Sequence, residues 1–341
     1  MRLTRRRFIA AGLTAATGIA LGSYGIYRMG QHIESLEPPK MSKVFLIETS
    51  DRKKAIKQIF NEFNSSNFNN AKIALKANYN SADSFPASTH IDSLRTIIET
   101  LKEVNVSDLI LAERSGMGNT RKVLEDSDVF NLADELSFQV KVLDEDPADN
   151  WTEISPEGLH WLRGFKIAKV FTDSDIVIQT CCLKTHRFGG HFTMSLKNSV
   201  GLIAKKDPSG FYDYMAELHS SPYQRLMIAE INRFYKTDLI IMDAIEAFVN
   251  GGPDRGQLIK PNLIIASEDR VAIDAVGIAL LRLYGSTPEV MKGRIFNLEQ
   301  ISRAVQLGVG VKSAFDIKLI PLDDKTRRIS NKIENILQTQ E

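Results

Sequence analysis

Short apolar runs rich in β-branched residues alternate along this chain with runs of helical periodicity, and this alternation restricts the fold more than any other feature. The predicted strands are 44–48, 72–77, 108–112, 138–143, 175–179, 239–243 and 263–266. The run 239–242 is continuously apolar, which is typical of a strand covered on both faces. The sequence therefore predicts an α/β fold with a mainly parallel, doubly wound (Rossmann-like) sheet and helices on both faces.

Three of the intervening runs predict helices. Apolar residues recur at helical spacing over 91–104 and again over 223–234. Ser221 followed by Pro222 predicts the N-cap and first residue of the second helix. Ser267 predicts the N-cap of a third, nearly all-apolar helix over 271–283, which we expect to be buried.

The first residues resemble a twin-arginine export signal. Arg5-Arg6-Arg7 precede the apolar pair Phe8-Ile9, and an uncharged run continues to Tyr27. A signal anchor with a chance arginine cluster is the alternative reading. The run is also just long enough to span a bilayer, for which about 20 residues are needed. We expect an exported protein, in the periplasm or on the outer face of the cytoplasmic membrane, whose signal is either cleaved or retained as an anchor.

The predicted organisation has four parts. Residues 1–29 form the export signal or anchor, 30–42 a linker, 43–325 a single α/β domain, and 326–341 a C-terminal tail. Lys and Arg number 43 against 42 for Asp and Glu, so the net charge of +1 predicts no nucleic-acid partner. The partners expected are an anionic small molecule, the export machinery and, if the anchor is retained, the membrane.

Cysteine usage excludes some cofactors. The chain has two cysteines, Cys181 and Cys182, and adjacent residues rarely satisfy disulfide geometry. They provide no spaced set for an iron–sulfur cluster or a structural zinc site, so we expect no iron–sulfur cluster. The identity of any cofactor stays open, with a divalent metal as one alternative.

Polar residues follow two of the predicted strands, where ligands of open α/β sheets bind. Lys76 and Asn78 lie at the end of the strand 72–77, and Glu113 follows the strand 108–112. Residues 115–118 could present backbone N–H groups to an anion, although a flexible helix-entry turn is the favoured explanation because they match no known phosphate-binding motif.

The strongest candidate site is a basic segment, defined here as residues 183–206. It contains five Lys or Arg, two His and no acid. Lys184 and His186 are two residues apart, so on an extended segment their side chains share a face. Lys197 and Asn198 follow in the same segment. Apolar residues between them argue against a fully solvated surface loop, so we expect a local positive field that binds an anion.

Two acidic residues are candidates for countercharge, metal ligand or base. Asp243 ends a predicted strand, and Asp274 lies in the apolar helix, where it needs a partner such as a lysine or a metal. Asp269 is expected to compensate the helix dipole. His219 is a further candidate for ligand binding.

The order of these motifs resembles the bacterial and archaeal family of domain of unknown function 362. The motifs are Lys76-x-Asn78, Lys184-Thr185-His186, Ser195-Leu196-Lys197-Asn198-x-x-Gly201, Gly252-Pro253-x-x-Gly256 and 266–275. The resemblance spans residues 72–310. It implies an α/β domain with redox- or cofactor-linked roles, because many members add a ferredoxin-like module. This sequence has no such module, and Phe248-Val249-Asn250 stands where members often have Met-Glu-Gly.

Our leading hypothesis is a protein that binds an anionic small molecule or cofactor in a basic cleft, either as a binder or as an enzyme. His186, Lys184 and Asp243 are the candidate catalytic residues, with His186 as the acid–base group. Lys76, Asn78, Glu113, Lys197, Asn198 and His219 are the candidate ligand-binding residues, and Asp243 and Asp274 the candidate metal ligands. One alternative is a non-catalytic binding or assembly protein at the membrane. A nicotinamide-dependent oxidoreductase ranks lower because no Gly-rich fingerprint follows the first strand.

Overall fold

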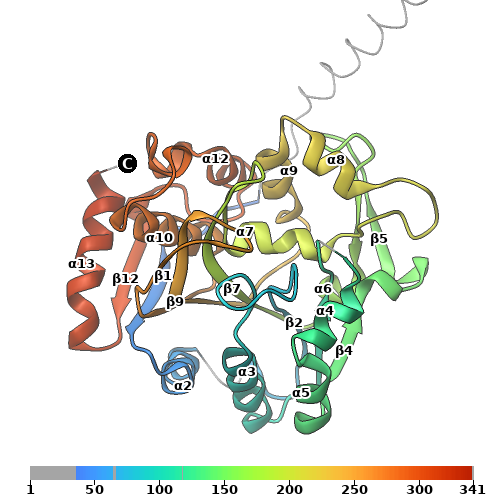
Figure 1. Cartoon of the computed structure of the whole chain (residues 1–341), viewed down its shortest axis with the longest axis horizontal. Coiled ribbons are helices and arrows are strands. Elements are labelled where there is room, and N and C mark those ends of the chain that lie inside the picture. The colour runs from blue at the N-terminus through green and yellow to red at the C-terminus, as the bar shows by residue number, and fades with distance from the viewer. Residues whose placement is uncertain (1–35, 64–66, 117, 340–341) are drawn as a thin grey trace, which may run out of the picture.

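The fold is built on one large, twisted sheet with helices packed on both faces (Figure 1). The computed structural model describes residues 36–63, 67–116 and 118–339. Within these residues the main sheet has ten strands, of which eight follow one another in the order β12-β1-β11-β9-β7-β2-β3-β4. Their bounds are β1 Ser42–Glu48, β2 Lys72–Lys76, β3 Asp108–Glu113, β4 Gln139–Val142, β7 Ile176–His186, β9 Leu239–Gly251, β11 Leu263–Ser267 and β12 Ile317–Pro321.

The strand directions confirm the predicted mainly parallel, doubly wound sheet. Neighbours pair in parallel from β9 to β4, and β1 is parallel to β12. The strand β11 runs against both of its neighbours, which makes the sheet mixed. The chain passes outward from β2 to β4 and then returns to place β7 on the other side of β2, so strand order reverses between β2 and β7.

Alternate residues of the central strands enter different cores, which is why their sequences are continuously apolar. In β9, Ile240 and Met242 belong to the cluster around α10 (Arg270–Leu283). Leu239 and Ile241 belong to the cluster on the opposite face, beside α3 (Ile91–Glu103). Burial of both faces contributes about 25 cal/mol for each Å² of apolar surface removed from water.

The helices divide between the two faces and the end of the sheet (Figure 1). Helix α2 and the α3–α5 region cover one face, α10 and α13 the other, and α8 and α9 join a third cluster beside a small β5–β6 ribbon. The remaining bounds are α2 Arg52–Glu62, α4 Thr120–Asp126, α5 Val129–Leu136, α6 Lys169–Thr172, α7 Ser195–Asn198, α8 Tyr214–Ser220, α9 Gln224–Ile231, α11 Pro288–Met291, α12 Glu299–Gln306 and α13 Asp324–Thr339, with strands β5 Trp151–Ile154, β6 Phe165–Ala168, β8 His191–Thr193 and β10 Gly256–Ile259.

Two predicted N-caps are wrong, each by two residues, since Tyr223 precedes α9 and Asp269 precedes α10. Ser221 ends α8 and its hydroxyl accepts from the N–H of Tyr223, so α9 begins only at Gln224. The N-cap of α10 is Asp269, whose carboxylate accepts from the N–H groups of Val271 and Ala272. The hydroxyl of Ser267 instead donates to the carbonyl of Lys43 on β1.

Three segments differ from the sequence-based expectation in length or class. Strand β7 continues seven residues beyond the predicted end at Gln179, to His186, because it pairs with an equally extended β9. The tail predicted at 326–341 belongs to the fold through residue 339. There α13 buries Ile333 and Leu337 in the same core as α10.

The predicted export signal, residues 1–29, lies outside the described residues, as does the first part of the linker, residues 30–35. Where the linker is described, the N–H of Leu36 donates to the carbonyl of Leu307 at 2.9 Å, so this part of the segment is already held to the domain. Within residues 36–63, 67–116 and 118–339, no helix combines the length and the apolar character needed to cross a bilayer.

Candidate functional site

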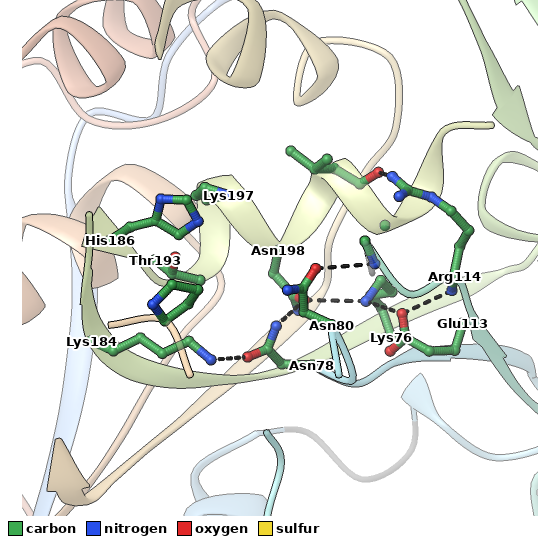
Figure 2. Close-up of a pocket in the computed structure, with 14 residues that line it drawn as sticks. Lys76, Asn78, Asn80, Glu113, Arg114, Lys184, His186, Thr193, Lys197 and Asn198 are labelled. Atoms are coloured by element: carbon green, nitrogen blue, oxygen red, sulfur yellow. Dashed lines mark hydrogen bonds and ion pairs between the residues drawn. The ribbon is translucent and has the colours of Figure 1, made fainter. Parts of the chain in front are cut away.

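A small polar pocket lies at the carboxyl ends of β2, β3 and β7, where the strand order reverses. Ligands of open α/β sheets bind at such a switch point. The pocket has a volume of about 40 Å³, which accommodates a few water-sized groups. Its described lining residues are Lys76, Asn78, Asn80, Glu113, Arg114, Gly116, Lys184, His186, Thr193, Lys197, Asn198, Val200, Gly201 and Pro253 (Figure 2).

One half of the pocket is a closed network around Lys76 and Glu113. Their charged groups are 2.6 Å apart, and both side chains are at most 2% exposed. Lys76 Nζ also donates to Asn198 Oδ1 at 3.1 Å, and Glu113 Oε1 accepts from the N–H of Arg114 at 2.9 Å. Burial lowers the pKa of Lys76 and raises that of Glu113, while each opposes the shift of the other. Glu113 therefore neutralises Lys76 and leaves no acid for the rest of the pocket.

The extension of β7 brings Lys184 and His186 into the other half. The two side chains share a face, as predicted, and both line the pocket. Lys184 pairs in register with Thr193 of β8, so these two side chains are cross-strand neighbours. Lys184 Nζ donates to Asn78 Oδ1 at 2.7 Å and to the carbonyl of Ala87. Burial lowers its pKa, and no carboxylate pairs with it among the described residues.

Lys197 and His186 have side-chain nitrogens without partners. In the described part of the chain, no hydrogen bond or ion pair involves Lys197 Nζ, and His186 Nδ1 is buried and unsatisfied. Burial, followed by the charge of Lys184, lowers the pKa of Lys197 to about 8. Burial and the charges of Lys197 and Lys184 hold the pKa of His186 well below its ordinary value, so the imidazole is neutral at pH 7.

Two glycines allow the lysines to approach the backbone. A Cβ on Gly201 would lie 2.6 Å from Lys76 Cε. A Cβ on Gly190 would lie 2.7 Å from Lys197 Cε and 3.0 Å from His186 Nδ1. A Cβ atom cannot come this close to another heavy atom, which explains why the motif 195–201 ends in glycine. Because a single point lies so near both groups, Lys197 and His186 are neighbours, as Figure 2 shows.

The sequence predicts that Asp274 contacts a lysine or a metal in the site, but its carboxylate accepts hydrogen bonds from the backbone instead. Asp274 Oδ1 and Oδ2 accept from the N–H groups of Ser195 and Leu196 at 2.8 and 3.0 Å. These residues begin α7, the short helix that carries Lys197 and Asn198. Burial raises the pKa of Asp274 to about 7 despite the two N–H donors. Asp274 therefore fixes the position of α7 from outside the pocket.

Asp243 and His219 do not line the pocket. Asp243 Oδ2 accepts from Arg52 Nε and from Ser93 Oγ, both at 2.7 Å. His219 Nδ1 lies 2.7 Å from the carbonyl oxygen of Met215 on its own helix. Of the described residues, no three His, Cys, Asp or Glu side chains gather to hold a metal. Asp243 and Asp274 therefore do not fit the predicted metal site.

Sequence reasoning missed some lining residues. Arg114 is 2% exposed and donates to the carbonyls of Ile203, at 2.9 Å, and Val200, so it braces the turn after α7. Asn80 Oδ1 accepts from the N–H of Gly116 at 3.0 Å. Thr193 is buried with an unsatisfied hydroxyl. Only the position of Arg114 and Asn80, within three residues of the ends of predicted strands, could have indicated them.

Comparison with known proteins gives a family and a distant structural likeness. No match to a curated protein is found for this sequence. The structure has some similarity to that of the lactate racemase apoprotein from Thermoanaerobacterium thermosaccharolyticum, with 14% sequence identity and a TM-score of 0.38. The alignment covers 60% of this chain and 50% of that one, so this chain spans about half the length of the racemase. The family model described as domain of unknown function (DUF362) matches residues 73–279, well over half of the chain. This chain therefore belongs to the DUF362 family.

Proposed function

We propose that the pocket binds a small anionic molecule, a carboxylate or a phosphate, beside Lys184, Lys197 and His186. The observation that supports this most directly is that the pocket has more cationic side chains than acidic ones to pair with them. Glu113 is the one acid among the described lining residues, and it is already bound to Lys76. Lys184 is a buried cation and Lys197 a half-buried one, and neither has a countercharge among the described residues, which is costly unless an anion joins them.

The depth of the site favours a small molecule over a protein partner. Lys184 is 1% exposed and Thr193 6% exposed, so the surface of a folded partner cannot reach them. Titratable groups with shifted pKa values that converge in a concave pocket are typical of ligand and active sites. This favours ligand binding over the alternative of a basic docking surface in an assembly at the membrane.

Acid–base chemistry on the bound anion is the second part of the proposal. Lys197, with a pKa of about 8, exchanges protons near neutral pH. His186 is neutral, and its unpartnered ring nitrogen Nδ1 lies beside the Lys197 side chain. The pair thus provides one group that can donate a proton and one that can accept it.

Calorimetric titration of the purified domain with inorganic phosphate and with propanoate tests the binding. We expect at least one anion to bind, with affinity lost in Lys197→Met and in the double variant Lys184→Ala/His186→Ala. Lys206→Met, in the same basic segment but with a side chain 69% exposed, is the matched control and should retain the wild-type affinity. Unchanged binding in both pocket variants, or no binding by the wild type, would overturn the proposal.

Export completes the proposal, on the basis of the N-terminal arginine motif alone. An anion-binding domain carried out of the cytoplasm by the twin-arginine route would arrive folded, with any ligand already in place.

A further inference from the structure

The three lysines of the pocket differ in what their nitrogens contact. Lys76 Nζ has Glu113 Oε1 at 2.6 Å and Asn198 Oδ1 at 3.1 Å, and Lys184 Nζ has Asn78 Oδ1 at 2.7 Å. Lys76 Nζ also donates to the carbonyl of Ala77, so it uses all three of its protons and has no free lone pair, and Lys184 Nζ is held in place by its two acceptors. Lys197 Nζ has no such acceptor in the described part of the chain, although its side chain lines the same pocket.

The surroundings of Lys197 resemble those of the nucleophilic lysine in enzymes that form imines. A desolvated amine beside another cation loses its proton more readily and gains nucleophilicity. The neighbouring cation is Lys184, and burial together with this charge lowers the pKa of Lys197 to about 8. Gly190 leaves room for Lys197 Cε and His186 Nδ1 to lie side by side.

We propose that Lys197 forms an imine with the carbonyl group of a small 2-oxo acid, an inference that rests on the anion-binding function proposed above. The carboxylate of the 2-oxo acid lies against Lys184 and Thr193, the cross-strand pair of β7 and β8. Lys184 has a third N–H beyond its two bonds, and the buried hydroxyl of Thr193 lacks a partner. The carbonyl carbon adjacent to that carboxylate then faces Lys197.

The reaction balances without an external oxidant or reductant. The lone pair of Nζ forms a C–N bond to the carbonyl carbon, and the π electrons of the carbonyl pass to its oxygen. The neutral imidazole of His186 takes a proton from the nitrogen and delivers it to the alkoxide oxygen, which becomes a hydroxyl. It then carries the second nitrogen proton to this hydroxyl, so that the C–O bond breaks, water leaves and the nitrogen lone pair forms the C=N bond. A ketone and a primary amine have become an imine and one molecule of water.

Reductive trapping tests the inference. The full chain is incubated with pyruvate and sodium cyanoborohydride, and tryptic peptides are mapped by mass spectrometry. We expect one reduced adduct, on Lys197. Lys197→Arg keeps the positive charge but is not a nucleophile, so it should lose the adduct while still binding propanoate, which has the carboxylate without the carbonyl. Lys206→Arg, on an exposed lysine, should give the wild-type adduct.

The outcomes separate this inference from the proposed function. Binding of pyruvate and propanoate without an adduct, or an adduct on Lys184, Lys206 or scattered lysines, would overturn the imine and leave anion binding standing. Absence of binding by either compound in calorimetry would overturn the imine, and for carboxylates it would overturn the binding function as well. If Lys197→Arg loses both the adduct and propanoate binding, the imine is not supported, and the role of Lys197 is to hold the anion by its charge.

Discussion

Asp274 accepts a hydrogen bond from the backbone N–H of Ser195 at 2.8 Å, and this bond ties the buried helix α10 to the first residue of α7. Asp274→Ala leaves this N–H and that of Leu196 buried without an acceptor, at about 1–3 kcal/mol each. We expect the free energy of unfolding to fall by about 2–5 kcal/mol. Because α7 carries Lys197, phosphate affinity should fall about tenfold, or about 1.4 kcal/mol. Urea denaturation and calorimetry measure the two effects.

Asp269→Ala is the matched control for that experiment. Asp269 is also a buried acceptor, for the N–H groups of Val271 and Ala272, but it holds the start of α10 rather than α7. It should lose stability and keep the wild-type affinity. Equal loss of affinity in both variants would mean that general loosening of the fold, and not the position of α7, weakens the site.

The raised pKa of Asp274 predicts a pH dependence of stability. Burial raises this pKa to about 7. In the unfolded chain it is about 3.9, so between the two values the folded state binds the extra proton. The contribution of Asp274 to the free energy of unfolding should therefore decrease as pH rises from about 4 to about 7. Urea denaturation across this range should show the free energy of unfolding of the wild type falling, relative to that of Asp274→Asn, as pH rises. A difference that is constant with pH contradicts the raised pKa.

Sequence patterns predicted the sheet because its signal is local. In Leu239–Met242 four consecutive apolar residues indicated burial on both faces, and the structure divides them between two cores. The candidate residues at three strand ends, Lys76, Glu113 and Lys184, meet for the same reason, since parallel strands end at one edge. The predicted N-caps of α9 and α10 are wrong for two different reasons. The hydroxyl of Ser221 forms a local turn with the N–H of Tyr223, whereas that of Ser267 bonds to the carbonyl of Lys43, which is distant in sequence.

What could not be predicted depends on contacts far apart in sequence. Asp243 was expected in the site because it follows an apolar run, but β9 continues to Gly251 and Arg52 lies against its carboxylate. Asp274 accepts hydrogen bonds from the backbone of α7, and no residue type in the sequence indicates a backbone partner. Arg114 braces carbonyls of the turn after α7, a role that only the folded chain defines.

Removing the charge of Lys197 should stabilise the ligand-free protein. Lys197→Met replaces a half-buried, unpartnered ammonium with an apolar chain of similar length, which we expect to raise the free energy of unfolding by about 1 kcal/mol at pH 7. The pKa of Lys197 is about 8 in the folded state and 10.5 as its ordinary value. Between them the unfolded state binds more protons, so the wild type gains stability as pH rises from about 8 to about 10.5. The advantage of Lys197→Met should shrink over this range in urea denaturation; an advantage that grows would contradict the lowered pKa.

Export is tested through the arginine motif. Replacing Arg5, Arg6 and Arg7 with lysine keeps the positive charge of the segment but removes the arginine pair that the twin-arginine route requires. We expect the protein to accumulate in the cytoplasm of the producing cell, as followed by fractionation and immunoblotting. Replacing Arg2 with lysine, outside the motif, is the control and should leave export unchanged. Normal export of the triple variant would mean that the segment acts as an ordinary signal anchor.

Gly190→Ala tests whether the spacing of Lys197 and His186 matters to the site. The new Cβ would lie 2.7 Å from Lys197 Cε and 3.0 Å from His186 Nδ1, so both side chains must move away from it. The end of a lysine moves easily, and we expect a change in the free energy of unfolding below about 1 kcal/mol. Phosphate affinity and the yield of the pyruvate adduct should both fall several-fold. Gly210→Ala, where the nearest atom lies 3.3 Å away in an exposed loop, should change neither. If Gly190→Ala binds and reacts as the wild type does, the close approach of Lys197 and His186 is incidental to the chemistry of the pocket.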